Sequence, residues 1–400
     1  MDTNKRLTLV SLNFHPEPTG IGPYATALAK NLGNEFSLHV IAGLPHYPSW
    51  RQEPFDDSEI LKDIRSLKRL AHVIPRSNAV LGRLMLELSF ALKVAVTRWK
   101  KPDALILTSP SLLTAAVSLA RARVFHRDTI VILWLQDLYG QGSKEIFKGK
   151  QIVQRIISWV ERKTAARADS VVVIHESFKA ILESEMGVSG SKVEVIPNWS
   201  QFSFNPNLTN ADTARKFELR DVPTVLHAGN MGRKQSLEFA ILAAGQSSKF
   251  QLLLVGDGAM KANLQELAKD FDNVLFLPPV TETDLSNLLN FSDILLVNES
   301  ADTGKMAVPS KLTTYMRAGK PIIAATSPDS NCAIEILKSG SGIIVEPGNP
   351  EALSSSIDSL LNDINKRNAL AENGKNYSDL FYASESSLAK FREHINTILK

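Results

Sequence analysis

The sequence predicts an α/β protein built from two doubly wound, Rossmann-like domains that face each other across a cleft. Its 400 residues are enough for two or three domains at about 150 residues each. Short β-branched or leucine-rich runs alternate with amphipathic stretches, and this alternation occurs twice along the chain. A segment rich in proline, asparagine and serine, residues 197–206, separates the two series.

The first series predicts an N-terminal domain over residues 1–200. Its apolar runs show almost no polar alternation, so their strands should be buried on both faces, as in a parallel sheet covered by helices. We expect these strands at residues 7–14, 37–43, 104–109, 129–136 and 170–175.

The second series predicts a C-terminal domain over residues 201–385, followed by a helix over 386–400 that packs back on the first domain. The same pattern predicts strands at residues 224–229, 251–258, 273–279, 293–299, 321–326 and 342–347. Ligands of open parallel sheets bind at the carboxyl ends of the strands, so the cleft is the expected site.

Composition excludes several classes of protein. Hydrophobic residues make up 44% and charged residues 22%, which is typical of a globular chain and not of a disordered one. The single cysteine, Cys332, allows no internal disulfide and favours a reducing compartment. Neither a signal-like N-terminus nor an uninterrupted apolar span of about 18 residues is evident, so we expect a cytoplasmic protein.

Basic residues gather in one region of the chain. The net charge is only +3, yet residues 60–101 contain ten Lys and Arg against two Asp and Glu. Such a region favours contact with an anionic surface, and we expect peripheral attachment of residues 60–101 to the inner face of the cytoplasmic membrane. The alternative interpretation is a solvated helical face. We expect no nucleic-acid partner.

Within that region, residues 81–101 predict a helix with apolar side chains on more than one side. Leu84, Met85 and Leu88 share the apolar face, whereas Phe90 and Val94 lie on another side, beside basic residues. Exposed apolar side chains among basic ones are typical of a membrane-interface helix. A helix buried between the sheet and a neighbour is the alternative.

The strongest motif is LHAGNMGRKQSLE, residues 226–238. It places Gly229 and Gly232 after a strand, then Arg233 and Lys234, and then a helix. Glycines let backbone amides approach an anion, and a helix N-terminus carries partial positive charge. The pattern therefore indicates binding of a diphosphate. The alternative is a glycine turn with two surface cations.

Two further junctions in the same domain have this character. The strand at 251–255 ends in Gly256-Asp257-Gly258 before a helix, and Pro309 stands where a first helical residue is expected, ahead of Ser310 and Lys311. Three strand-to-helix junctions in one sheet could each bind an anion. Together they favour a binding site for a nucleoside diphosphate more than any one of them does.

The order of these segments resembles the retaining glycosyltransferases of family 4, which have the GT-B fold. The resemblance spans nearly the whole chain and is carried by NFHPEPTGIGPYATALAKNL, ADSVVVIHESFKAIL, VEVIPNW, AGNMGRKQ, LLLVGDG, PSKLTTYMRAGKP and GIIVEPGNPEALSSSI. PSKLTTYM and WLQDLYG look most like the branch that builds bacterial surface polysaccharides, such as the colanic-acid and O-antigen enzymes.

The resemblance implies a function and a donor. It implies a hexosyltransferase-type enzyme that moves a sugar from a nucleoside-diphosphate-sugar, with retention, to a lipid-linked or saccharide acceptor in exopolysaccharide, O-antigen or capsule synthesis. Uridine diphosphate is our first choice of carrier and guanosine diphosphate the second. A polyprenyl-diphosphate-linked saccharide is the expected acceptor. No cofactor and no metal are expected.

The resemblance also implies site residues. Lys234 and Arg233 would hold the donor diphosphate, and Asp137 is the first-domain carboxylate expected to orient the acceptor or the sugar. The other residues expected at the donor are Gly20, Gly22, Gly229, Asn230, Gly256, Gly258, Glu299, Ser310, Lys311 and Leu312.

The sequence departs from the family pattern in several places. The family's two glutamates, eight positions apart, are Met306 and Thr314 here, and Glu299 or Asp302 would have to substitute. The frequent His-Asp of the first domain reads Gln136-Asp137, and the usual arginine after the second-domain glycine is Asn230.

Three other functions fit parts of the sequence. A non-catalytic subunit that binds a nucleotide-sugar or a partner enzyme would account for the missing glutamates. A nucleotide-sugar epimerase could share the fold. A dehydrogenase is suggested by the G-x-G-x-x-A pattern from Gly20 to Ala25, but Pro16 and Pro18 separate these glycines from the strand.

Overall fold

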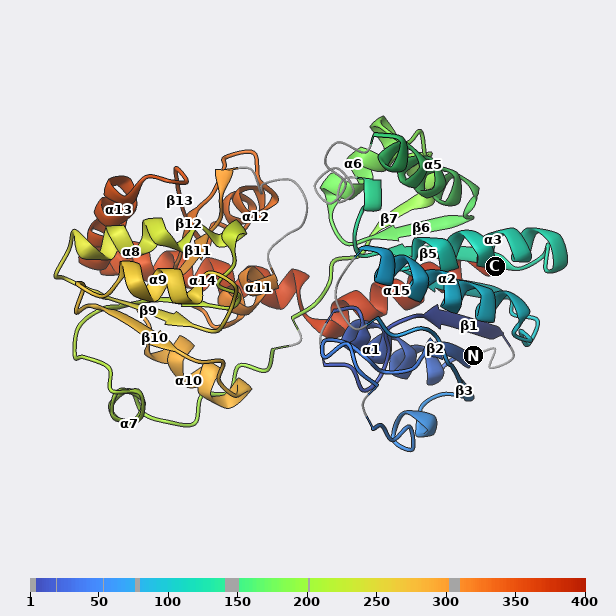
Figure 1. Ribbon diagram of the computed structural model, residues 1–400, viewed down its shortest axis with the longest axis horizontal. Coiled ribbons are helices and arrows are strands. Elements are labelled where there is room, and N and C mark those ends of the chain that lie inside the picture. Colours follow the sequence, from blue (N-terminus) through green and yellow to red (C-terminus); the bar gives the residue numbers. More distant parts are fainter. Residues whose placement is uncertain are drawn as a thin grey trace. The chain divides into compact units, whose positions relative to one another are not determined.

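The computed structural model of the chain describes residues 5–18, 20–52, 54–75, 80–140, 151–200, 202–301 and 310–400. The chain divides into two compact units (Figure 1). Unit 1 comprises Met1–Asn198 and Ser387–Lys400, and unit 2 comprises Trp199–Ser386. Each unit is a parallel sheet covered by helices, which confirms the predicted fold class of two parallel-sheet α/β domains.

The sheet of unit 1 has seven parallel strands in the order β3-β2-β1-β4-β5-β6-β7. The strands are β1 (Arg6–Ser11), β2 (Ser37–Gly43), β3 (Ser66–Leu70), β4 (Ala104–Thr108), β5 (Ile130–Leu135), β6 (Ser170–Val173) and β7 (Val193–Val195). The order reverses between β1 and β4, and this is the switch point at which ligands of such sheets bind.

Helices on both faces bury the sheet of unit 1. They are α1 (Gly22–Gly33), α2 (Val80–Val96), α3 (Leu112–Phe125), α5 (Gln151–Arg167) and α6 (Glu176–Ser184). The last helix, α15 (Ser384–Ile398), lies against this unit. The Phe391 ring packs edge-on to the Trp134 ring, with 5.2 Å between the ring centroids. His394 Nε2 lies 2.7 Å from Ser170 Oγ.

Helix α2 turns a different side to the core from the one its sequence suggests. Phe90 and Val94, which we placed on another side beside the basic residues, are completely buried, whereas Leu88 is 48% and Leu92 58% exposed. Helix α3 packs against α2, and Phe90 and Val94 belong to the core of unit 1. The leucine face is therefore the exposed one.

The sheet of unit 2 has six parallel strands in the order β10-β9-β8-β11-β12-β13, with its switch point between β8 and β11. The strands are β8 (Thr224–Ala228), β9 (Gln251–Val255), β10 (Val274–Leu277), β11 (Ile294–Asn298), β12 (Ile322–Ala325) and β13 (Gly342–Val345). The helices are α7 (Asn210–Phe217), α8 (Leu237–Gly245), α9 (Lys261–Leu267), α10 (Glu282–Phe291), α11 (Ser310–Arg317), α12 (Asn331–Ser339), α13 (Pro350–Asn362) and α14 (Ile364–Phe381).

Every strand predicted from the sequence is present, but two strands of unit 1 were not predicted. β3 carries Lys68 and Arg69 at the sheet edge, and β7 is only three residues long. An edge strand needs no continuous apolar run, so neither gives the buried pattern that marks the central strands. None of the helices in the described ranges is long and apolar enough to cross a membrane.

Candidate functional site

The two glycine loops of unit 2 interlock backbone to backbone. Gly229 N–H donates to Val255 O at 2.9 Å, and Met231 N–H donates to Asp257 O at 2.8 Å. A Cβ atom on Gly256 would lie 2.0 Å from Gly229 O, and one on Gly258 would lie 2.5 Å from the Met231 backbone. Glycine is therefore required at both positions for the loops to pack together.

The turn that carries Arg233 and Lys234 is fixed by its neighbours. Ser300 N–H donates to Lys234 O at 2.9 Å, and the Asn298 side-chain amide donates to Gln235 O and Ser236 O at 2.7 and 2.8 Å. These bonds use the backbone of the turn, and the side chains of Arg233 and Lys234 are both exposed.

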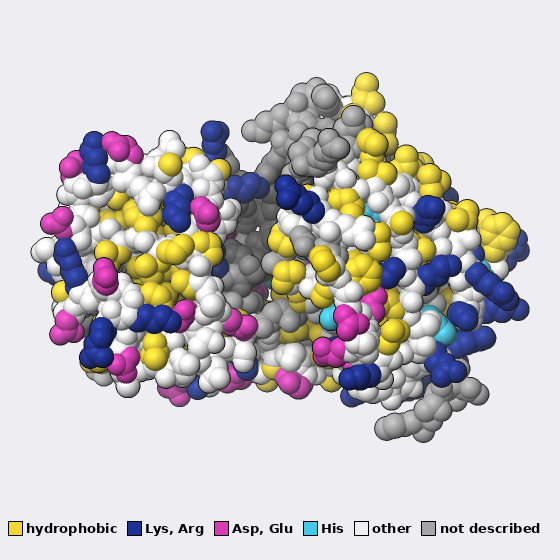
Figure 2. All heavy atoms as spheres, turned by 60° about the horizontal axis from the view of Figure 1, so that its bottom comes forward, with side chains coloured by type: hydrophobic (Ala, Val, Ile, Leu, Met, Phe, Trp, Pro, Cys, Tyr) yellow, Lys and Arg dark blue, Asp and Glu magenta, His cyan; other side chains and the backbone are white. Residues whose placement is uncertain are grey.

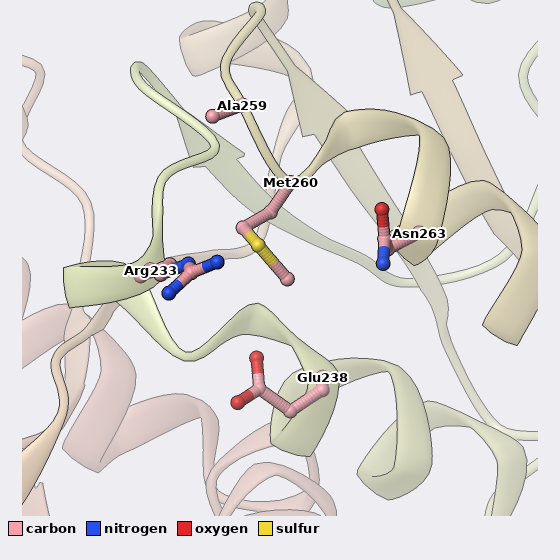
Figure 3. A pocket seen from close by; sticks show the side chains of 5 residues that line it. All are labelled: Arg233, Glu238, Ala259, Met260 and Asn263. Atoms are coloured by element: carbon pink, nitrogen blue, oxygen red, sulfur yellow. The ribbon is translucent and has the colours of Figure 1, made fainter.

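A cavity of about 450 Å³ lies on one side of this turn (Figure 3). Arg233 points toward it, and the other lining residues come from α8 and from the loop and helix after β9. They are Glu238, Ala259, Met260 and Asn263. Arg233 thus borders an open space beside the glycine loops.

Helix α11 begins where the sequence places Ser310, and its first turn holds the expected Lys311 and Leu312. Leu312 is completely buried, so only its backbone is open to a ligand. Backbone N–H groups in a first helical turn lack acceptors within the helix. Thr314, at the position of one family glutamate, is half-buried on the same helix. The other position, Met306, and Asp302 lie outside the described residues.

Glu299 follows β11 directly and is half-buried. Its Oε2 accepts a hydrogen bond from Thr326 Oγ1 at 2.6 Å. Burial raises the pKa of Glu299, while the bond from Thr326 and the nearby Lys311 oppose that rise. The structure thus places Glu299 close to Lys311 at the carboxyl end of the sheet.

The glycine loop of unit 1 surrounds a buried carboxylate that the sequence did not single out. Glu17 Oε1 accepts hydrogen bonds from the backbone N–H groups of His46 at 2.8 Å and Tyr47 at 2.9 Å. A Cβ atom on Gly22 would lie 2.9 Å from Glu17 O, and Gly20 has a φ of 66°. Both glycines therefore have a local structural reason in the packing of this loop.

Asp137 lies in the loop that follows β5. Desolvation of its carboxylate raises the pKa to about 6, although the residue keeps an exposed surface. The next residues are held from two helices. Glu161 on α5 accepts from the backbone N–H groups of Tyr139 and Gly140 at 2.6 and 2.8 Å, and Tyr139 Oη donates to Glu87 on α2 at 3.1 Å.

The preceding residue, Gln136, is tied to the end of unit 1. Its side-chain amide exchanges two hydrogen bonds with that of Asn198, at 3.1 and 2.5 Å. The residue that replaces the family's histidine therefore has a structural bond partner. Over the described ranges, no cluster of three or more His, Cys, Asp and Glu side chains could hold a metal ion.

Two family models together match most of the chain. A glycosyl transferase 4-like domain matches residues 19–199, and the model for glycosyl transferases group 1 matches residues 210–377. The first match lies in unit 1 except for its last residue, Trp199, and the second lies in unit 2.

Curated relatives agree with these matches. The chain is 28% identical to the putative colanic acid biosynthesis glycosyl transferase WcaI of Escherichia coli, over 96% of this chain and 98% of that protein. It is 26% identical to the probable glycosyltransferase WbjE of Pseudomonas aeruginosa, over 72% of this chain and 74% of that protein.

Solved structures share the fold. HepE of Anabaena, in complex with UDP, matches with a TM-score of 0.72 and 16% identity, covering 98% of this chain and all of that one. Taken with the two family models and the full-length relative, this similarity shows that the chain belongs to the GT-B glycosyltransferases, with a glycosyl transferase 4-like domain followed by a group 1 domain.

Proposed function

We propose that this glycosyltransferase moves a hexose from a nucleoside-diphosphate-sugar to a lipid-linked or saccharide acceptor in bacterial surface-polysaccharide synthesis. The similarity to the colanic acid enzyme supports the pathway class, and the UDP and UDP-glucose complexes of HepE support a uridine diphosphate carrier. Guanosine diphosphate is the second choice, since a mannosyltransferase that depends on GDP-mannose is also similar to part of the chain.

The observation that carries the proposal is the set of anion-binding features around the switch point of unit 2. A rigid turn presents Arg233 and Lys234, the interlocked glycine loops bring backbone amides beside it, and α11 begins nearby with Lys311 in its first turn. Backbone amides and cations of this kind bind phosphate groups without a metal.

Catalysis would then consist mostly of charge stabilisation. As the sugar leaves, negative charge develops on the diphosphate, and preorganised amides together with Lys234 and Arg233 would stabilise it. The acceptor hydroxyl would attack the same face of the sugar that the diphosphate leaves, so the configuration would be retained without a protein nucleophile. No cofactor takes part in this scheme.

Asp137 is the carboxylate of unit 1 that we propose orients the acceptor or accepts its proton. With a pKa of about 6, it would be mostly ionised at neutral pH and would lose its charge as the pH falls below that value. A transfer assay with a panel of UDP- and GDP-sugars and lipid extract, run from pH 5 to 8 (a range set about that pKa), tests both function and role.

We expect transfer from one donor class, with an acid limb near pH 6 that the Asp137→Asn variant lacks because its amide does not titrate. Transfer from none of the donors would contradict the proposed function. An unchanged acid limb in the variant would remove Asp137 from the mechanism and leave the function standing.

If the acceptor is lipid-linked, the enzyme has to work at a membrane. Unit 1 has a surface that fits such a contact. Three neighbouring helices, α2, α3 and α5, carry exposed apolar side chains beside lysines and arginines. On the face of unit 1 that Figure 2 presents, apolar and basic side chains are interspersed. The exposed apolar residues of the surface are Leu84, Met85, Leu88, Leu92 and Val96 on α2, Val124 and Phe125 on α3, and Ile152, Ile156 and Trp159 on α5.

We propose that this surface lies on an anionic bilayer, each basic group adding about 1 kcal/mol that salt screens. The full chain should float with phosphatidylglycerol vesicles at low salt and be released at high salt. Leu92→Glu, which places a carboxylate on the apolar face, should weaken flotation. The matched control is Leu380→Glu on α14, whose leucine is 64% exposed in unit 2. Equal flotation of both variants would contradict the proposed surface.

A further inference from the structure

Strands β8 and β11 diverge at the switch point of unit 2. They pair at only two positions, Val225 with Ile294 and Leu226 with Leu295. Beyond these pairs, side chains satisfy the backbone. Ala228 N–H donates to Tyr315 Oη at 2.8 Å, and His227 Nδ1 lies 3.2 Å from Leu296 O. The gap between the strands is thus filled by polar side chains with defined partners.

The contact with Leu296 O favours one tautomer of His227. A carbonyl oxygen can only accept, so Nδ1 carries the proton and Nε2 presents a lone pair. Lys311 Nζ lies 3.3 Å from Nε2 and donates to it. The imidazole is completely buried, and this burial, together with the charge of Lys311, lowers the pKa of His227, although backbone hydrogen bonds with Leu296 and Asn230 act in the opposite direction. His227 is therefore a neutral acceptor that holds the ammonium group in place.

One flank of the Lys311 ammonium is bordered by the backbone of the glycine loop, which carries no side chain there. Gly229, which is exposed, has a φ of 139°, and a Cβ atom there would lie 3.7 Å from both Cε and Nζ of Lys311. Any side chain at position 229 would cover this flank. Lys311, which is partly exposed as a residue, thus borders the same loop that we propose binds the donor.

Among the described residues, few charges compensate this cation. The groups that face it are His227 from β8, Glu299 after β11 and Cys332 from α12. In the part of the chain that the structure describes, no carboxylate oxygen lies within 4.0 Å of Nζ. Burial lowers the pKa of Lys311 to about 8, although Glu299 and Cys332 act in the opposite direction. An anion arriving at this flank would stabilise the charged form.

We propose that the Lys311 side chain binds the diphosphate of the donor directly and that His227 positions it. This inference deepens the proposed function and rests on it. It assigns a side chain to charge stabilisation where the family's usual arginine is Asn230, and it places that side chain on α11 rather than on the glycine loop.

The protein should therefore take up a proton when it binds the diphosphate. Near pH 8 the free Lys311 is about half protonated, and a bound diphosphate raises its pKa, so up to about half a proton enters per UDP bound. Calorimetric titration of the full chain with UDP in two buffers of different ionisation enthalpy measures this number. GDP replaces UDP as the probe if the transfer assay identifies a guanosine donor.

Two substitutions at Lys311 distinguish the effect of its positive charge from the effect of its titration. Lys311→Met should weaken UDP binding by about 10- to 100-fold and abolish proton uptake, because a charged hydrogen bond is lost. Lys311→Arg should bind UDP without uptake, because a guanidinium does not titrate near this pH. The matched control, Lys249→Met, removes an exposed lysine paired with Asp358 and should keep both affinity and uptake.

The positioning role of His227 has its own readout. His227→Gln keeps an acceptor for Lys311 and should retain the wild-type pH midpoint of proton uptake, whereas His227→Met removes the acceptor and should shift it. UDP binding with full proton uptake in Lys311→Met and Lys311→Arg would overturn the inference while leaving the proposed function intact. Binding of neither UDP nor GDP by the unaltered chain would overturn both.

Discussion

Replacement of Lys234 by alanine should lower kcat/KM for sugar transfer by about 10²- to 10³-fold and leave the fold unchanged. That range is typical for the loss of one group that stabilises developing charge in the transition state. The fold should tolerate the change because the turn is fixed through its backbone: Ser300 N–H binds Lys234 O, and Asn298 holds the next two carbonyl groups. Initial rates with the preferred donor, together with circular dichroism, measure both effects.

The matched control for this variant is Lys249→Ala, which removes an exposed lysine from the same unit and should change kcat/KM less than about 2-fold. If Lys234→Ala retained the wild-type kcat/KM, the assignment of the diphosphate to this turn would be wrong.

Replacement of Gly256 by alanine should destabilise unit 2 by about 3–5 kcal/mol and abolish donor binding. The added Cβ would lie 2.0 Å from Gly229 O, and the φ of 140° is one that other residues rarely adopt. The two glycine loops would have to separate, and the backbone groups that face the donor would move with them. A loss of this size corresponds to a fall in Tm of about 10 °C for a unit of this length.

Gly348→Ala is the control for the backbone effect alone. Gly348 has a φ of 78°, but the nearest atom to an added Cβ is the Phe239 ring at 3.8 Å, an ordinary contact. Only the left-handed backbone conformation would then lower the free energy of unfolding of Gly348→Ala, by about 1–2 kcal/mol. Thermal unfolding with and without UDP compares the two variants. Equal Tm values would mean that the close packing of the glycine loops contributes nothing to stability.

The sequence predicted the central strands well because strands buried on both faces have a recognisable pattern, a continuous run of apolar residues. Runs such as residues 130–135 and 294–298 contain almost only apolar side chains, since helices cover both faces of a parallel sheet. Edge strand β3 lacks a continuous apolar run, because a strand with one open edge can carry charged side chains. Its position depends on β2, which the local sequence does not specify.

Helix α2 shows why a periodic pattern alone was insufficient. Both sides of the helix carry apolar residues, so the period predicts a helix without saying which side is buried. The choice depends on the rest of the core, to which α3 and other distant parts of the chain contribute.

The candidate site was predicted in outline, since glycines, lysines and a helix start have local signatures. Its finer contacts were not. His227 appears in the sequence only as one residue of a buried strand, and its partners Leu296 and Lys311 are 69 and 84 residues away. Glu87 and Glu161 likewise occupy ordinary helical positions, and only the fold brings them to the loop after Asp137.

A crystal structure of the protein with bound UDP tests the central claim most directly. The account predicts phosphate oxygens within hydrogen-bond distance of Lys234 Nζ and Lys311 Nζ, beside the backbone of Gly229. A well-ordered UDP whose phosphates bind elsewhere, with both ammonium groups left without phosphate contacts, would contradict it.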